Sequence, residues 1–284
     1  MAFLIRFACS ATIPDWFDAR SVETAGHVHD PNPASKAPTL SVIVPTYNEA
    51  QRIDHTIETI LSYLDQQPYD SELLIVNDGS TDETSSRARR WQDRSARLRV
   101  IDIPHAGKAA AVRRGVAAAS MDLVVFTDAD LATPIAFLEP FREAIAAGYD
   151  VVIGSREGAG AARIGEPLLR HVMGRAFNVL VRVLLVPGIQ DTQCGFKMFT
   201  RDAASDLFRS SRLYADEEET TGARVTAFDV ELLVIANRRH YAIKVIPVTW
   251  TFGTQSKVSP VRDTITNLTD ILKVKLFDLR GFYD

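Results

Sequence analysis

The stretch Leu123–Asp130 reads Leu-Val-Val-Phe-Thr-Asp-Ala-Asp and passes abruptly from apolar residues to two carboxylates. A short apolar run of this kind indicates a buried strand of a parallel sheet. Open α/β sheets bind ligands at the carboxyl ends of such strands. Asp128 and Asp130 are therefore candidates to share a divalent cation with a diphosphate, since hard cations prefer oxygen ligands. Taken alone, the pattern also fits a strand followed by an Asp-rich turn.

The composition is that of an ordinary soluble globular protein. The chain has 284 residues, of which 46% are hydrophobic and 24% charged, and its net charge is -4. This balance argues against a nucleic-acid partner. Two cysteines, Cys9 and Cys194, are too few for a disulfide framework and favour the reducing cytoplasm. No stretch approaches the ~20 apolar residues of a membrane span.

Strands and helices alternate through the first half of the chain, which predicts an α/β fold with a parallel sheet. Residues 1–37 show no periodicity and are expected to form a partly mobile extension. Expected strands cover 39–45, 72–76, 98–103, the residues before Asp128, and 150–154; expected helices cover 53–64, 108–119 and 135–147.

The second half is less regular. Expected helices cover 167–186 (interrupted at Gly174), 202–208, 228–237 and 264–279, and an expected strand covers 243–250. A polar turn over 191–197 enters a short strand. The acidic segment 214–224 is expected to be a mobile surface loop, and 253–260 a polar loop.

Polar residues follow four of the expected strands: Thr46–Glu49, Asp78, Lys108, and the pair Asp128 and Asp130. In a parallel sheet these strand ends lie on one edge. Their chemistry suits a ligand with a diphosphate and a base or ribose. The sequence has no G-x-G-x-x-G after its first strand and no G-x-x-x-x-G-K-[ST]. The absence of these motifs argues against a dinucleotide-dependent dehydrogenase and against a P-loop NTPase.

Together these motifs resemble those of family 2 glycosyltransferases with the GT-A fold. The resemblance is carried by Pro45–Glu49, Asn77–Asp82, Gly107–Lys108 and Asp128–Asp130. Three later segments are similar to the dolichyl-phosphate β-glucosyltransferase branch of that family: Gly154–Arg156, Asp191–Lys197 and Ala227–Leu233. The resemblance implies one GT-A domain over 38–284, with a nucleotide-sugar half (38–155) and an acceptor half (156–284). The sheet would be mostly parallel and Rossmann-like.

The resemblance also implies roles for the donor side. The uridine end of UDP-glucose would be held by Pro45, Tyr47, Glu49 and Asp78. Lys108, Asp128 and Ala129 would lie near the ribose and the sugar. Asp130 would be the principal ligand to Mg²⁺ or Mn²⁺, with Asp128 beside it, and the cation would screen the leaving diphosphate. The reaction would be an inverting transfer of glucose.

The implied acceptor is a dolichyl or polyprenyl phosphate. Arg156 and Arg170, with Lys197 in reserve, are candidates to bind its phosphate, because guanidinium groups match phosphate oxygens. Asp191 and Gln193 belong to the same acceptor-binding set. Asp229 is a candidate base or acceptor-orienting carboxylate, and its alternative role is a helix N-cap.

Other functions remain open at this point. The donor could instead be GDP-mannose or another UDP-hexose, and the acceptor a soluble molecule or a saccharide. Ala132 stands where related lipid-phosphate mannosyl enzymes carry a polar residue, which favours the glucosyl branch. The absence of Q-x-x-R-W argues against a processive polysaccharide synthase. A nucleotide-sugar-binding scaffold without turnover is the alternative from another class.

Two expected helices combine apolar and basic residues. They cover 168–186 and 264–280 and resemble helices that lie in a membrane interface. We therefore expect a cytoplasmic protein bound peripherally to the inner face of the membrane. Attachment would come from these helices, because the chain does not show the N-terminal anchor of eukaryotic family members. Their alternative role is burial in the core or at the contact of a homodimer.

Overall fold

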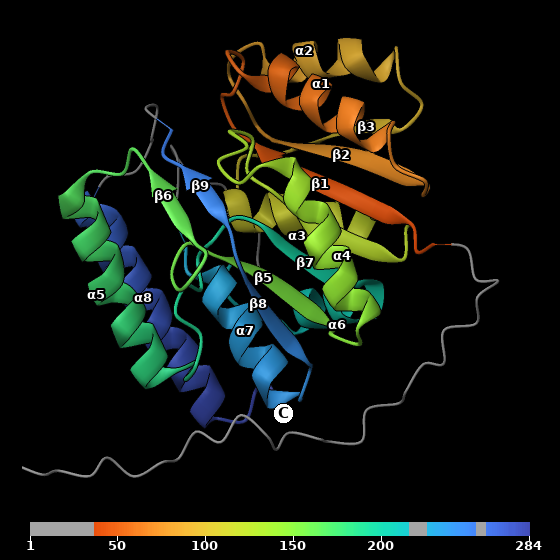
Figure 1. Cartoon of the computed structure of the whole chain (residues 1–284). Helices are drawn as coiled ribbons and strands as arrows, with labels where there is room; N and C mark the ends of the chain where they lie inside the picture. Colours follow the sequence, from red (N-terminus) through yellow and green to blue (C-terminus); the bar gives the residue numbers. More distant parts are fainter. Residues whose placement is uncertain (1–36, 216–225, 254–259) are drawn as a thin grey trace, which may run out of the picture.

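The computed structural model describes residues 37–215, 226–253 and 260–284 (Figure 1). The predicted extension over 1–37 lies outside these ranges except for its last residue. Most of the predicted loops over 214–224 and 253–260 also lies outside the described residues.

Across the described residues, seven strands form one sheet in the order β3-β2-β1-β4-β7-β5-β8. Their bounds are β1 (Leu40–Thr46), β2 (Ser71–Asp78), β3 (Leu98–Ile103), β4 (Leu123–Phe126), β5 (Val151–Ser155), β7 (Lys197–Thr200) and β8 (Ile243–Pro247). A second, two-stranded sheet pairs β6 (Ala162–Ile164) with β9 (Thr249–Thr251).

Helices cover both faces of the large sheet (Figure 1). They are α1 (Ile53–Leu64), α2 (Thr84–Gln92), α3 (Lys108–Ala118), α4 (Leu138–Ala146), α6 (Arg201–Ser210) and α7 (Phe228–Arg238), with a short 3-10 helix, η1 (Ile135–Phe137), before α4. Two further helices, α5 (Leu168–Leu184) and α8 (Pro260–Leu279), lie side by side at one side of the molecule, with α8 in contact with α7 (Figure 1). This layered arrangement confirms the predicted α/β class.

The sheet is mostly parallel, as predicted, but β7 runs the other way. It lies between β4 and β5 and pairs antiparallel with both. β7 is thus the exception that a mostly parallel sheet allows. The reversal places Lys197, the first residue of β7, opposite Phe126 and Ile153. Lys197 therefore lies at the edge where the parallel strands end.

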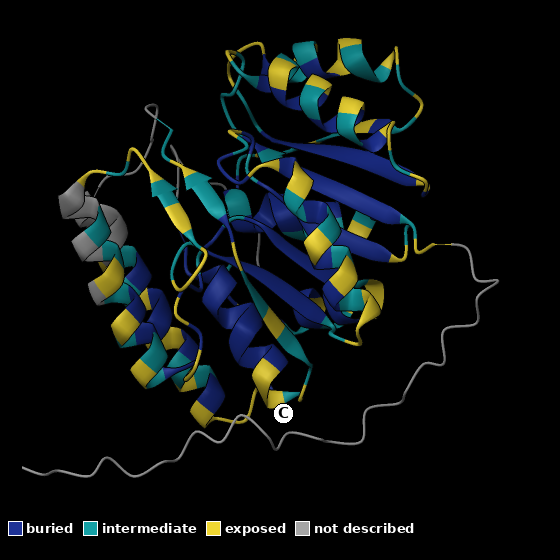
Figure 2. Ribbon diagram, viewed as in Figure 1, coloured by how far each residue is buried: buried dark blue, intermediate teal, exposed yellow. Residues whose placement is uncertain are grey.

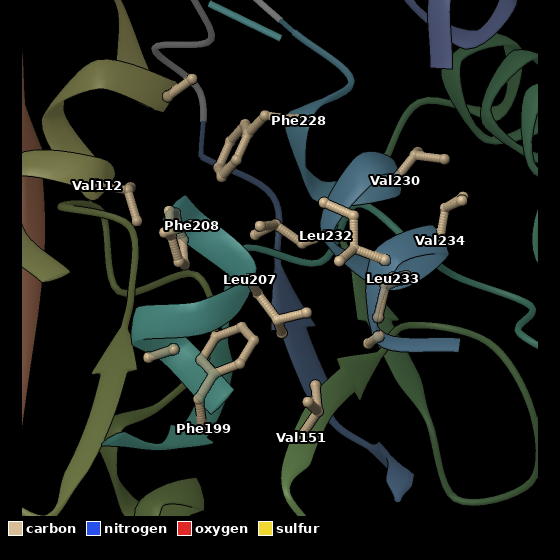
Figure 3. Packing of buried hydrophobic residues seen from close by; sticks show 14 of the residues in the cluster. Val112, Val151, Phe199, Leu207, Phe208, Phe228, Val230, Leu232, Leu233 and Val234 are labelled. Atoms are coloured by element: carbon tan, nitrogen blue, oxygen red, sulfur yellow. The ribbon is translucent and has the colours of Figure 1, made fainter. Parts of the chain in front are cut away.

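Side-chain alternation along the strands divides the core into two layers. Figure 2 shows that most strands of the large sheet are buried. On β1, Val42 and Val44 face the layer with α1 and α4, whereas Ile43 faces the layer with α3, α6 and α7. Figure 3 shows part of the second layer, where Leu207 and Phe208 of α6 pack near Leu232 of α7. Since both faces are covered, the strands are apolar on both sides.

Three local predictions differ from the structure. The predicted strand over 243–250 is two strands, β8 and β9, because the chain turns from the large sheet to the small one at buried Val248. The amide of Val248 donates to the carbonyl of Ser155 (2.9 Å). The short strand β6 was not predicted. Gly174 does not interrupt α5, which is continuous from Leu168 to Leu184.

Candidate active site

Five segments meet at the edge where β1, β2, β4 and β5 end. They are the turn after β1, the end of β2, the start of α3, the turn after β4 and Arg156 after β5. The reversed strand β7 adds Lys197 at its beginning. The common polarity of the parallel strands is why residues far apart in the sequence lie on one edge.

The centre of the site is a cluster of unlike charges. Lys108 Nζ lies 2.5 Å from Asp128 Oδ1. Partial removal from water and then the negative charge of Asp128 raise the pKa of Asp130, although the residue remains exposed at the surface. Although burial opposes its charge, the pKa of Lys108 is raised, chiefly by Asp128 and then by Asp229. Lys108, Asp128 and Asp130, singled out from the sequence, are thus electrostatically coupled in space.

The carboxylate pair fits a divalent cation. Asp128 repels the charge of Asp130, and a cation beside both would relieve that repulsion. Within the ranges that the structure describes, no group of three or more His, Cys, Asp or Glu side chains could hold a metal ion. A cation here would take its other ligands from a diphosphate and water, which is the usual mode for Mg²⁺.

Asp78 organises the turn that leads to Lys108. Its carboxylate accepts hydrogen bonds from the amides of Ala106 (2.8 Å) and Gly107 (2.9 Å). It also lies 2.8 Å from Nδ1 of His105. His105 in turn stacks on Tyr47, with ring centroids 3.9 Å apart. The structure thus brings Asp78 and Tyr47 together, joined by a histidine that the sequence did not single out.

Other predicted donor residues have contacts that fix the backbone of the site. Glu49 forms an ion pair with Arg52 (2.9 Å). The carbonyl of Ala129 accepts a hydrogen bond from Thr56 Oγ1 (2.6 Å). Pro45 lies in β1, next to its end. Helix α1, which carries Thr56, therefore ties down the turn that presents the two aspartates.

Asn48 was missed as an organising residue. Its φ of 52° is in the left-handed region, where Asn is among the favoured non-glycine residues. Its Oδ1 accepts hydrogen bonds from the amide of Thr81 (2.8 Å), and its own amide donates to Ser80 Oγ (2.9 Å). Asn48 thereby joins the first two polar turns. The signal in the sequence is an asparagine in the turn that follows β1, two residues after the strand ends.

Asp191, predicted with Arg156 to contact the acceptor, binds Arg156 instead. The guanidinium donates two hydrogen bonds to the carboxylate, from Nε (2.8 Å) and from the second terminal nitrogen (2.9 Å). The Asp191 side chain is 0% exposed. Burial opposes its ionisation, but Arg156 lowers its pKa to about 2. Arg156 also lies over the ring of Trp250, 5.3 Å from the centroid. The ion pair with Asp191 fixes the orientation of the guanidinium.

Lys197 is not placed to bind an acceptor directly. Its side chain is 1% exposed, and its ammonium donates to Asp229 Oδ1 (2.7 Å) and to the carbonyl of Cys194 (2.5 Å). The prediction of direct contact is therefore wrong, because the bonds to Asp229 and Cys194 hold the ammonium inside the protein. Asp229 is not a helix N-cap either, since Ala227 occupies that position in α7.

The segment 191–197 connects these parts. A Cβ on Gly195 would lie 2.6 Å from the carboxyl carbon of Asp128, so the backbone packs directly on that side chain. The amide of Gln193 donates to Asp191 Oδ1 (3.3 Å). One segment thus touches Asp128, Arg156 through Asp191, and Asp229 through Lys197. Arg170 lies in α5, but its side chain is outside what the structure describes.

The sequence of the chain matches a known family over most of this fold. The model of the family "Glycosyl transferase family 2" matches residues 41–208. A dolichyl-phosphate beta-glucosyltransferase of Homo sapiens is 34% identical over 257 residues, covering 85% of this chain and 76% of the human protein. A dolichyl-phosphate beta-glucosyltransferase of Trichomonas vaginalis is 33% identical over 258 residues, covering 84% and 73%.

Solved structures share the fold. Glucosyl-3-phosphoglycerate synthase from Mycobacterium tuberculosis, crystallised with uridine diphosphate, superposes with a TM-score of 0.58 over 84% of this chain and 80% of that one, at 21% sequence identity. Another structure of that enzyme holds Mn²⁺ together with uridine diphosphate. The GT-A-type fold inferred from the motifs is thereby confirmed. The chain belongs to glycosyl transferase family 2.

Proposed function

We propose that the chain transfers glucose from UDP-glucose, with inversion and with the help of Mg²⁺ or Mn²⁺, to a dolichyl or polyprenyl phosphate. The observation that carries this proposal is the 191–197 segment. It packs against Asp128, one of the two carboxylates that would hold the cation, and it binds Arg156, a cation suited to phosphate, through Asp191. The names of the relatives support this choice of donor sugar and acceptor.

On the donor side, Asp130 and Asp128 would hold the cation, which when bound supplies positive charge to the leaving diphosphate. Lys108, paired with Asp128, is a second positive charge at the same place. The turn fixed by Asp78 carries Lys108, and Tyr47 stacks on His105 beside that turn. These residues therefore suit a nucleoside diphosphate whose base lies at the β1–β2 end of the edge.

On the acceptor side, positioning matters more than deprotonation. A phosphate monoester is already anionic at neutral pH, so it needs less help from a general base than an alcohol does. Arg156 keeps a planar, charged group in one orientation because Asp191 binds it through two hydrogen bonds. The remaining N–H groups of the guanidinium would donate hydrogen bonds to the acceptor phosphate. Arg170 and Gln193 stay predictions for the same subsite.

The test is release of UDP by purified protein given UDP-glucose and Mn²⁺, with and without a short polyprenyl phosphate in detergent. The proposal requires strong stimulation by the lipid phosphate and none by the matching polyprenol. Slow hydrolysis that is indifferent to lipid would redirect the search to soluble acceptors. If neither UDP-glucose nor GDP-mannose is turned over, the result would favour a nucleotide-sugar-binding scaffold without enzymatic activity.

Changing Arg156 to lysine is expected to raise the acceptor KM by about tenfold and to leave the donor KM unchanged. Lysine keeps the charge but loses the planar, two-pronged geometry, a difference worth roughly 1.4 kcal/mol. Steady-state kinetics with the lipid phosphate varied at saturating UDP-glucose measures this.

The matched control is Arg238→Lys, because Arg238 forms a similar two-pronged pair with Asp278 in another part of the protein. This control should leave both KM values as in the wild type. An unchanged acceptor KM in Arg156→Lys would remove Arg156 from the proposed subsite.

We also propose that helices α5 and α8 bind the protein to the membrane surface. On α8, the exposed apolar residues Ile265, Leu272, Leu276 and Leu279 recur at helical spacing. At 100° per residue, exposed Lys273 and Arg280 fall within about 80° of that stripe. Apolar residues flanked by cations suit an anionic lipid surface.

Helix α5 adds a second exposed pair, Val179 and Val183. Its C-terminal half lines one cavity together with α7 and α8. Within the described ranges, no helix combines the length and apolar character needed to cross a membrane. The exposed apolar residues of both helices suit binding at the membrane surface, which would bring the enzyme to a lipid acceptor.

Replacing Leu272 by glutamate is expected to weaken binding to vesicles rich in phosphatidylglycerol by on the order of tenfold. Leu272 is 65% exposed, so its removal loses apolar contact with lipid and adds a repelled charge. Co-sedimentation with vesicles measures the change. Ser62→Glu on α1 is the control, since it adds the same charge at another exposed position. Equal vesicle binding by wild type and Leu272→Glu would refute the proposed surface.

A further inference from the structure

Lys197 is an unusual residue for its position. The next residues of β7, Met198 and Phe199, are apolar and buried, as expected for a strand between two others. Lys197 is equally buried, and lysine is almost never fully buried unless it is paired. An apolar residue would pack equally well at this position. The presence of a lysine therefore indicates that its positive charge has a role.

The charge that explains Lys197 is Asp229. The ammonium lies 2.7 Å from Asp229 Oδ1, and the Asp229 side chain is 7% exposed. The carbonyl of Cys194 accepts a second hydrogen bond at 2.5 Å, and the ring of Phe126 lies below, 5.5 Å from centroid to nitrogen. All three neighbours are oriented toward the cation. The lysine and the carboxylate thus form one buried, neutral unit.

This unit belongs to the same segment as Asp191, the partner of Arg156, since Lys197 ends the stretch 191–197. The charge of Asp229 acts on Lys108, together with those of Asp128 and Asp130. The charge of Lys197 acts on Asp191, the partner of Arg156. These side chains comprise four carboxylates (Asp128, Asp130, Asp191 and Asp229) and three cations (Lys108, Arg156 and Lys197). A cation held by Asp128 and Asp130 would balance those two carboxylates, and Arg156 balances Asp191. Asp229 is the carboxylate whose ion-pair partner is Lys197.

We propose that Lys197 is a positioning residue that neutralises and orients Asp229, so that an anionic acceptor can approach Arg156 without repulsion from that carboxylate. This inference rests on the proposed function, because it concerns the entry of a phosphate. It assigns Lys197 no contact with the acceptor. It also makes Asp229 an orienting group held by Lys197 rather than a base that must take up a proton.

The experiment is a double-mutant cycle with Lys197→Met and Asp229→Asn, read as acceptor KM, donor KM and kcat. Lys197→Met should raise the acceptor KM at least tenfold and change the donor KM by less than twofold. The double variant should bring the acceptor KM back to within about threefold of the wild type, because it removes the carboxylate that required the counter-charge. A merely structural role for Lys197 would move the donor KM and the thermal melting temperature together with the acceptor KM, because an unpaired buried carboxylate destabilises the whole fold. Recovery confined to the acceptor KM is therefore the required result.

Lys244→Met is the matched control, since it removes an exposed ammonium from β8 of the same sheet. It should leave all three constants unchanged. An acceptor KM in the double variant as high as in Lys197→Met would overturn the proposal. The proposal would also be overturned if Asp229→Asn severely lowered kcat and the double variant had an equally low kcat. That result would make Asp229 an obligatory base.

Two further measurements keep the outcome clear. If Lys197→Met does not fold, Lys197→Gln replaces it, and a wild-type acceptor KM in that neutral variant would refute the need for charge. The wild type is assayed first with short polyprenyl phosphate. If it does not use that acceptor, the proposed function fails. If it does and the cycle behaves additively, the inference about Lys197 alone fails.

Discussion

Asp130→Asn is expected to lower metal-dependent UDP release by on the order of a thousandfold. The amide keeps the shape of the side chain and loses the anionic oxygen that a hard cation prefers. A bound metal supplies several kcal/mol of stabilisation to the leaving diphosphate, and roughly 4 kcal/mol corresponds to that factor in rate. The second carboxylate, Asp128, is already paired with Lys108, so it is a poor substitute.

The measurement is a Mn²⁺ titration of the rate, with EDTA-treated protein as the starting point. The wild type should regain activity as Mn²⁺ is added, whereas Asp130→Asn should stay inactive at all concentrations. Asp93→Asn, at an exposed position at the end of α2, is the control for the loss of one charge. Near-wild-type rates in Asp130→Asn would remove the argument for a metal at this carboxylate.

Gly195→Ala is expected to reduce kcat by about a hundredfold while the protein stays folded. The added methyl group would lie 2.6 Å from the carboxyl carbon of Asp128, which is closer than real Cβ contacts come. Asp128 would have to swing away and leave its pairing with Lys108. A misplacement of about 1 Å at a reacting centre can cost roughly a hundredfold in rate.

Gly174→Ala in α5 is the matched control, because a Cβ there meets nothing within 4 Å. It should keep full activity, and helix propensity predicts a gain in stability of roughly 1 kcal/mol. Circular dichroism and thermal melting of both variants separate misfolding from a local clash. Full activity in a folded Gly195→Ala would show that Asp128 can move without consequence.

The gathering of Asp78, Lys108, Asp128 and Asp130 at one edge of the sheet could be predicted from the sequence, because each lies next to its own strand. Asp78 ends a strand, Lys108 begins a helix, and the other two follow a strand, and parallel strands bring such positions to one edge. Tyr47 and Glu49 follow from the same reasoning. The contact of His105 with Tyr47 could not be predicted, since the stacking depends on the path of the turn that Asp78 fixes.

The acceptor side was predicted less well, because its roles depend on pairings between distant segments. Arg156 and Asp191 were both named as contacts of the acceptor, and the structure shows that they bind each other. Lys197 and Asp229 were also named separately and form one buried pair. Sequence spacing says nothing about such partners when they are 32 or 35 residues apart.

The sequence by itself determined the family, the alternation of strands and helices, and the carboxylates available to a cation. These follow from local patterns: apolar runs, turn residues and the order of motifs. Only the tertiary structure decided that β7 is reversed, that Lys197 points inward, and that Gly195 packs on Asp128. The physical reason is that strand direction and buried ion pairs are set by which surfaces fill the core together, and a linear pattern does not carry that information.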